Sequence, residues 1–379
     1  MSGFVPGLTV AGDFFAEVVR PILTTHFPAL EYGAALIGPG SEVLGFDTPM
    51  SMDHDWGLRV FLFLRDDDDD DDDAQELSRR IASVLSFQLP PAFRDLPVAI
   101  ATLTPTSSVR GMELAGAMPL GPVKHHVVPM TVRRFCEVQL GCDPTAAPGL
   151  SAAAWLSIPS HALGEVVGGG GGGGGAVFLD TTGEITELRR RLAWYPRDVH
   201  LYLLAAGWQR IGDEEHLAPR AGHAGSELGS ALIGSRLVRD IVHLCFLMER
   251  RYAPYAKWLG TAFAGLDCAA AMGPLLRRVQ VATSWEERQT SLGEAYELLA
   301  TMHNAMRLTR PMHTGLSYFH DRPWKVIRGE EFAQALVGMI TDEEVKAIAK
   351  RSLIGSVSQW SDSVAMEHVK HKNIQEIYK

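Results

Sequence analysis

Two short segments near the N-terminus contain residues suited to bind a phosphate and a divalent metal ion. The first is Gly38-Pro39-Gly40-Ser41, and the second, Asp53-His54-Asp55, begins after eleven intervening residues. Glycines in a turn at the end of a strand let the backbone approach a phosphate closely, and the Ser41 hydroxyl can add a hydrogen bond. We therefore expect Gly40 and Ser41 to cradle a phosphate.

The two aspartates suit a magnesium ion. Residues two apart in a strand point to the same face, so Asp53 and Asp55 are expected to project together at the edge of the strand predicted over 55–64. Neighbouring carboxylates repel each other unless a cation lies between them, and Mg²⁺ is often held by one or two carboxylates plus substrate phosphates. Two alternatives stay open: the aspartates cap the turn after Pro49-Met50-Ser51, and Ser41 is an ordinary turn serine.

This order of a strand, a Gly-Ser turn, about a dozen residues and an Asp-x-Asp on the next strand resembles the nucleotidyltransferase superfamily of DNA polymerase β and kanamycin nucleotidyltransferase. Longer segments look like the family called domain of unknown function 4037, and the resemblance covers nearly the whole chain. These segments are residues 38–57, 191–211, 236–266 and 353–363. The resemblance implies a polymerase-β-like fold and an enzyme that uses Mg²⁺ to transfer a nucleoside monophosphate from a nucleoside triphosphate to an acceptor hydroxyl. It does not specify the acceptor. In such an enzyme Gly40 and Ser41 would cradle the triphosphate.

The sequence departs from the superfamily at the third carboxylate, which active members carry on a later strand. The strand predicted over 123–132 contains no acidic residue. Two aspartates can hold one Mg²⁺, but a second metal, which would activate the attacking hydroxyl, generally needs the third acid. Either Glu113 or a histidine such as His126 takes its place, or catalysis is weakened or lost. In the second case the chain is a non-catalytic nucleotide-binding or interaction module.

A polar stripe marks the helix predicted over 226–251, for which Ser226 is the expected N-cap. The stripe consists of Arg236, Arg239, Asp240 and His243, spaced i, i+3, i+4, i+7. In one interpretation Arg236, Arg239 and the nearby Lys257 contact phosphate or the acceptor. In the other, the stripe faces solvent with an internal Arg236–Asp240 ion pair.

The hydrophobic periodicity predicts an α+β fold. Helices are expected over 10–26, 74–87, 197–211, 226–251, 285–306 and near 330–350, and strands over 32–37, 55–64, 97–103 and 123–132. We expect a mixed sheet with helices, followed by an α-helical domain. The predicted division is a nucleotidyltransferase-like domain over 1–150, a Gly-rich linker region over 151–184, an α-helical domain over 185–319, and a C-terminal helical extension and tail over 320–379.

Two low-complexity runs interrupt the chain, Asp66 to Asp73 and Gly168 to Gly175. Eight like charges in sequence repel and stay hydrated, which predicts an enlarged surface loop, with a calcium-binding loop as the alternative. The glycine run predicts a flexible expansion in a linker. Without the eight aspartates the net charge is −2 instead of −10. The remaining surface is near neutral, so a nucleic-acid partner is not expected.

The overall composition, 46% hydrophobic and 21% charged, is that of a soluble globular protein. No apolar run approaches the ~20 residues needed to span a bilayer, and the N-terminus lacks the pattern of a secretory signal. Four cysteines without a C-x-x-C pair argue against a disulfide framework and a zinc ribbon. We expect a cytoplasmic protein with no membrane partner, which binds a nucleotide and a small-molecule or protein acceptor.

Overall fold

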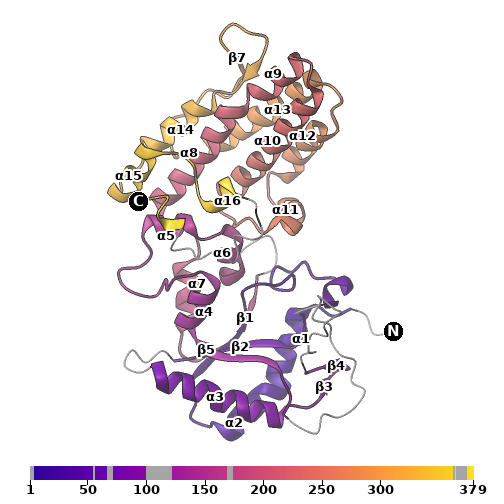
Figure 1. The fold of residues 1–379 in the computed structure, drawn as a ribbon, viewed down its shortest axis with the longest axis vertical. Coiled ribbons are helices and arrows are strands. Elements are labelled where there is room, and N and C mark those ends of the chain that lie inside the picture. The colour runs from indigo at the N-terminus through magenta and orange to yellow at the C-terminus, as the bar shows by residue number, and fades with distance from the viewer. Residues whose placement is uncertain are drawn as a thin grey trace. The chain divides into compact units, whose positions relative to one another are not determined.

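The computed structural model describes residues 4–53, 56–65, 71–99, 122–168, 174–361, 363 and 374–379, with the backbone alone for Asp53 and Asp71. The chain forms two compact units (Figure 1). The N-terminal unit consists of residues 1–149 and 162–193, and the helical unit consists of residues 150–161 and 194–379.

The N-terminal unit is built on a mixed sheet, which confirms the α+β class. Within the described residues the strand order is β5-β2-β1-β6. Strand β1 is antiparallel to both β2 and β6, whereas β2 is parallel to β5. The four strands are β1 Tyr32–Leu36, β2 Arg59–Leu64, β5 His126–Thr131 and β6 Ala176–Asp180; a separate short hairpin pairs β3 Ala92–Phe93 with β4 Leu96–Pro97.

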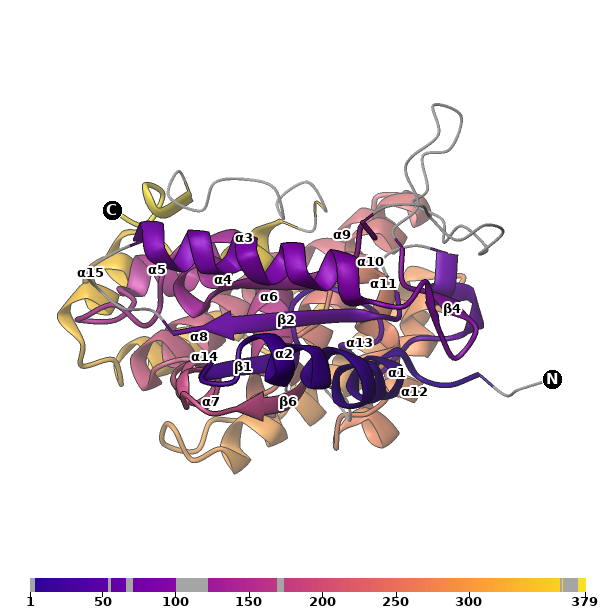
Figure 2. The ribbon, with the colours of Figure 1, turned by 90° about the horizontal axis from the view of Figure 1, so that it is seen from below.

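Helices cover both faces of this sheet because side chains along β2 alternate between the two faces. Leu62 packs with Phe14, Leu23 and Leu85 in one core cluster. Figure 2 looks onto this side, which is covered by α1 Gly7–Phe14, the π-helical turn η1 Phe15–Val19, α2 Arg20–His26 and α3 Asp71–Gln88. On the opposite face the Phe63 ring meets the Phe135 ring edge-on at 5.2 Å. That face is covered by α4 Val132–Gln139 and α7 Glu184–Arg191.

Residues 162–193 belong to the N-terminal unit, which differs from the linker region expected over 151–184. Strand β6 pairs with the free edge of β1, and Phe178 stacks on Phe15 at 5.8 Å. Gly175 N also donates to Val43 O at 2.8 Å. An apolar pentapeptide after a glycine run becomes a strand because β1 offers it an unpaired edge. Gly169 to Gly173 lie outside the described residues.

The last three residues of the aspartate run are helical and not part of a loop as predicted, since α3 begins at Asp71. Acidic residues in the first turn of a helix interact favourably with the helix dipole. Residues 66–70 of the run lie outside the described part of the chain. The strand expected over 97–103 can be compared only over residues 97–99, because residues 100–121 are not described. Of these three residues, only Pro97 belongs to a strand, β4.

The helical unit contains most of the predicted helices at nearly the predicted bounds. Ser226 caps α10 as expected, accepting a hydrogen bond from Gly229 N at 3.0 Å. The helix expected near 330–350 is divided in two, because Asp342 accepts from Val345 N at 2.9 Å and starts a new helix. The elements are α5 Ala152–Ser157, α8 Arg197–Glu214, α9 Leu217–His223, α10 Glu227–Met248, α11 Ala256–Phe263, α12 Ala269–Val281, α13 Trp285–Ala305, β7 Ser317–Tyr318, β8 Lys325–Val326, α14 Gly329–Val337, α15 Glu343–Arg351 and α16 Val357–Trp360; α6 Ser160–Val167 runs across the boundary between the units.

None of the helices in the described residues has the length and apolar character that crossing a membrane requires.

Candidate functional site

The Gly-Ser turn leaves the end of β1 through two residues with positive φ, Gly38 at 90° and Gly40 at 146°. The backbone then curls into a helical turn, in which Leu44 N donates to Gly40 O and Phe46 N donates to Ser41 O. A Cβ at residue 40 would lie 2.6 Å from Arg59 Nη2. Glycine is therefore required here both by the backbone conformation and by the space available.

A buried ion pair, absent from the sequence prediction, fixes this turn. Arg59 Nη2 donates to Glu42 Oε1 and to Pro39 O, both at 2.7 Å. Burial raises the pKa of Glu42, and the neighbouring Arg59 guanidinium only partly offsets that effect. Because Arg59 is the first residue of β2, the pair joins the turn after β1 to the start of the next strand. Glu42 and Arg59 belong to no common sequence motif, so their pairing could not be predicted from the sequence.

The segment with the Asp-x-Asp motif enters β2 later than expected. Asp53 is the last residue of a 3₁₀ helix, η2 Pro49–Asp53, and β2 begins at Arg59 instead of residue 55. The backbone at Asp53 is therefore helical, so the rule that residues two apart in a strand share a face does not apply there. His54, Asp55 and the Asp53 side chain, like Glu113, lie outside what the structure describes.

An acid that sequence reasoning missed, Asp47, holds the loop between the turn and β2. Its Oδ2 accepts from Gly7 N at 2.7 Å and from Trp56 Nε1 at 2.8 Å. The Gly7 N–H is one of the donors that a helix leaves unsatisfied at its N-terminus. Asp47 thus ties Trp56, the residue that follows the Asp-His-Asp segment, to the start of α1.

Strand β5 forms where it was predicted, and it carries no acidic residue. It is parallel to β2, and its first residue, His126, is the register partner of Arg59. In the described part of the chain, no group of three His, Cys, Asp or Glu side chains is arranged to hold a metal ion.

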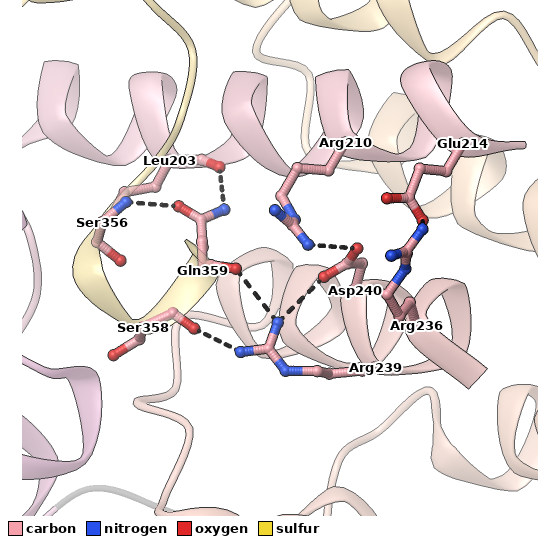
Figure 3. Close-up of polar contacts among 9 residues, drawn as sticks. All are labelled: Leu203, Arg210, Glu214, Arg236, Arg239, Asp240, Ser356, Ser358 and Gln359. Atoms are coloured by element: carbon pink, nitrogen blue, oxygen red, sulfur yellow. Dashed lines mark hydrogen bonds and ion pairs between the residues drawn. The ribbon is translucent and has the colours of Figure 1, made fainter. Parts of the chain in front are cut away.

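The polar stripe of α10 faces α8 and the C-terminal segment (Figure 3). The ion pair expected between Arg236 and Asp240 is not formed: Arg236 Nη2 lies 3.0 Å from Glu214 Oε2 of α8. Asp240 accepts instead from Arg210 at 3.1 Å and from Arg239 at 3.2 Å. The reason is that α8 carries Glu214 and Arg210 opposite the stripe. The spacing of residues within α10 does not show which side chains a second helix will bring near.

Arg239 holds the segment around α16 against α10. Its Nη2 donates to Ser358 O at 3.0 Å and its Nη1 to Gln359 O at 3.2 Å. Gln359 in turn donates to Leu203 O of α8 at 3.0 Å and accepts from Ser356 N at 3.0 Å. These bonds connect three segments that are far apart in sequence (Figure 3).

A cavity of about 180 Å³ lies beside this cluster, within the helical unit. Its walls include Ser160, His161, Arg239, His243, Tyr255 and Ser358. Of the other predicted phosphate contacts, neither Arg236 nor Lys257 lines it. Lys257 is exposed on α11, with Nζ 4.8 Å from the centre of the Trp258 ring. Arg239 and His243 thus line one cavity, and Lys257 does not.

Residues 155–259 match the model of a family described as Domain of unknown function (DUF4037). This match confirms the resemblance to the DUF4037 family over these residues; the segments 38–57 and 353–363, where the resemblance was also expected, lie outside the match. A comparison with curated proteins finds no match. Among solved structures, the chain is similar to the crystal structure of a nucleotidyltransferase-like protein from Exiguobacterium sibiricum 255-15, with 12% sequence identity, 85% of this chain and 88% of that chain covered, and a TM-score of 0.31.

The DUF4037 match includes most of the cavity wall. Ser160, His161, Arg239, His243 and Tyr255 all fall within residues 155–259. The Gly-Ser turn and the Asp-His-Asp segment lie before the matched residues.

Proposed function

We propose that this protein transfers a nucleoside monophosphate from a nucleoside triphosphate to an acceptor hydroxyl, with Mg²⁺ held by Asp53 and Asp55. The observation that carries the proposal is the pairing of β1 with β2. The strands are antiparallel neighbours, with Ala35 opposite Phe61, so the C-terminal end of β1 and the N-terminal end of β2 lie next to each other. The Gly-Ser turn follows the end of β1, and in the sequence the Asp-His-Asp segment comes directly before Trp56, which only Gly57 and Leu58 separate from β2.

The contacts around the turn support the same assignment. Arg59 and Glu42 hold the turn, with its positive-φ backbone at Gly40, in one conformation, which supports a preformed binding loop. Two carboxylates plus phosphate oxygens are a donor set that Mg²⁺ prefers. When bound, the metal would neutralise the charge that builds up on the phosphates during transfer.

The proposal assigns fewer ligand contacts to the helical unit than the polar stripe of α10 predicted. We assign no triphosphate contact to Arg236, which pairs with Glu214, or to Arg239, because the cavity of about 180 Å³ beside it is too small for a nucleotide. A phosphate contact by the exposed Lys257 stays a prediction.

The test uses the full chain with Mg²⁺ and one labelled nucleoside triphosphate at a time, with pyrophosphate release and Mg²⁺-dependent nucleotide binding as two readouts. We expect Asp53→Asn and Asp55→Asn to abolish release. Asp95→Asn is the matched control, since Asp95 is exposed in the β3–β4 turn and Asn tolerates its positive φ of 66°. Equal release by all three variants would refute the proposed metal site.

One observation favours a second function, nucleotide binding without catalysis. Strand β5 has no acid beside β2, and His126 stands at its first position. A second metal would lack its usual carboxylate there. This function predicts saturable, Mg²⁺-dependent nucleotide binding that Asp53→Asn weakens, together with no pyrophosphate release from any of the four triphosphates.

A further inference from the structure

The cavity of the helical unit is lined by both apolar and polar residues. Pro254, Leu259, Val357 and the Tyr255 ring are apolar; Arg239, His243, Ser160 and Ser358 are here called the polar end; and His161, Ser361 and Ser363 are further polar lining residues. Its volume of about 180 Å³ is below the 300–1,000 Å³ typical of drug-sized ligand sites. A nucleotide therefore does not fit, whereas a single ring or a short branched chain does.

The polar end continues into a second, smaller cavity. Ser160, His243 and Ser358 line both spaces, and the inner one measures about 20 Å³. That is enough for one water molecule. Within the described part of the chain, we find no hydrogen bond made by the His243 ring. Because the ring lines both spaces, its nitrogens are left for a ligand or a water to bind.

Two guanidiniums act on the His243 ring. Burial, together with the charges of Arg239 and Arg210, lowers the pKa of His243 to about 3. The imidazole is thus neutral near pH 7 and offers one donor and one acceptor. The first turn of α11, at Ala256, also lines the cavity and adds the positive end of a helix dipole. Burial disfavours a charge of either sign, so it is the two guanidiniums and this helix end that favour an anion beside His243.

We propose that this cavity binds a small organic carboxylate, with the carboxylate at Arg239 and His243 and a compact apolar body between Tyr255, Leu259 and Val357. The apolar walls argue against a free phosphate, because a dianion needs several donors in place of the water it loses. The site is independent of the proposed nucleotidyl transfer, since every residue that lines it belongs to the helical unit.

The probe is benzoate, titrated into the full chain by calorimetry and by ligand-observed NMR. We expect saturable binding that is at least tenfold stronger than that of benzamide, the neutral analogue of the same shape, and of inorganic phosphate. Equal affinity for benzamide would overturn the anionic part of the proposal, and tighter binding of phosphate would replace the carboxylate by a phosphate. Absence of saturable benzoate binding would refute the site.

Two variants locate the binding. Leu259→Trp fills the cavity from a partly exposed position, and His243→Gln changes the polar end. We expect each to weaken benzoate binding about tenfold, while His313→Gln, at an exposed histidine outside the cavity, leaves it unchanged. Circular dichroism and the unfolding midpoint verify that each variant is folded. Unchanged binding by folded Leu259→Trp would show that benzoate binds elsewhere and would overturn the proposal.

Discussion

The carboxylate of Glu42 and the guanidinium of Arg59 form a buried ion pair, 2.7 Å apart, with side chains that are 3% and 13% exposed. The pair joins the turn after β1 to the first residue of β2. It therefore fixes the position of the proposed phosphate-binding turn relative to the start of β2.

Breaking this pair from one side should be costly. Glu42→Gln leaves the Arg59 guanidinium buried without its counter-ion, and we expect a loss of about 3 kcal/mol in the free energy of unfolding. The double variant Glu42→Gln/Arg59→Met should be less destabilised than the sum of the two single variants. Urea unfolding of the parent protein, the single variants Glu42→Gln and Arg59→Met, and the double variant measures this coupling, and strict additivity would contradict the structural role.

The turn should not tolerate a side chain at Gly40. Gly40→Ala places a Cβ 2.6 Å from Arg59 Nη2 and imposes strain at a φ of 146°, for an expected cost of about 1–3 kcal/mol. Gly149→Ala is the control, because Gly149 has a positive φ of 103° but nothing within 4 Å of the added Cβ. If the two variants unfold at the same urea concentration, the close approach of Arg59 has no energetic weight.

Arg239 and Arg236 should differ strongly although they lie one helical turn apart. Arg239→Met removes the bonds to Ser358 O and Gln359 O and one partner of buried Asp240, so we expect a loss of about 2–4 kcal/mol. Arg236→Met removes a pair whose arginine is 57% exposed, worth at most about 1 kcal/mol. Hydrogen exchange of residues 356–361 should rise in the first variant alone. Equal exchange in both variants would show that Arg239 does not hold the segment around α16 against α10.

Glu215 should make stability depend on pH. It is buried, and its carboxylate accepts from Ile327 N at 2.5 Å and from Gly329 N at 3.1 Å. Burial raises the pKa of Glu215 to about 7 from a usual 4.5. The folded state then binds more protons than the unfolded state between these values, so the free energy of unfolding falls as pH rises from about 4.5 to about 7, by up to about 3 kcal/mol.

Glu215→Gln should remove this component. Urea unfolding at about pH 5 and about pH 8 should show a smaller difference for the variant than for the parent protein. An unchanged difference would assign the pH dependence to other groups.

Local signals accounted for much of the secondary structure. The predicted helix 285–306 corresponds to α13 Trp285–Ala305, and Ser226 caps α10 as the spacing indicated. Such elements were predictable because apolar periodicity and capping depend on residues within one or two turns. The predicted start of the strand at residue 55 was less accurate, since a 3₁₀ turn covers residues 49–53 and β2 begins only at Arg59.

The sequence by itself determined the α+β class, the main helices, the strands β1 and β5 and the DUF4037 resemblance, because these depend on neighbours along the chain. Only the tertiary structure decided that residues 176–180 become a sheet strand, that Arg236 pairs with Glu214 instead of Asp240, and that Glu42 meets Arg59. Each of these contacts joins residues at least 17 positions apart, as Glu42 and Arg59 are. A buried charge takes whichever partner the fold brings within reach, and spacing along a single element does not contain that information.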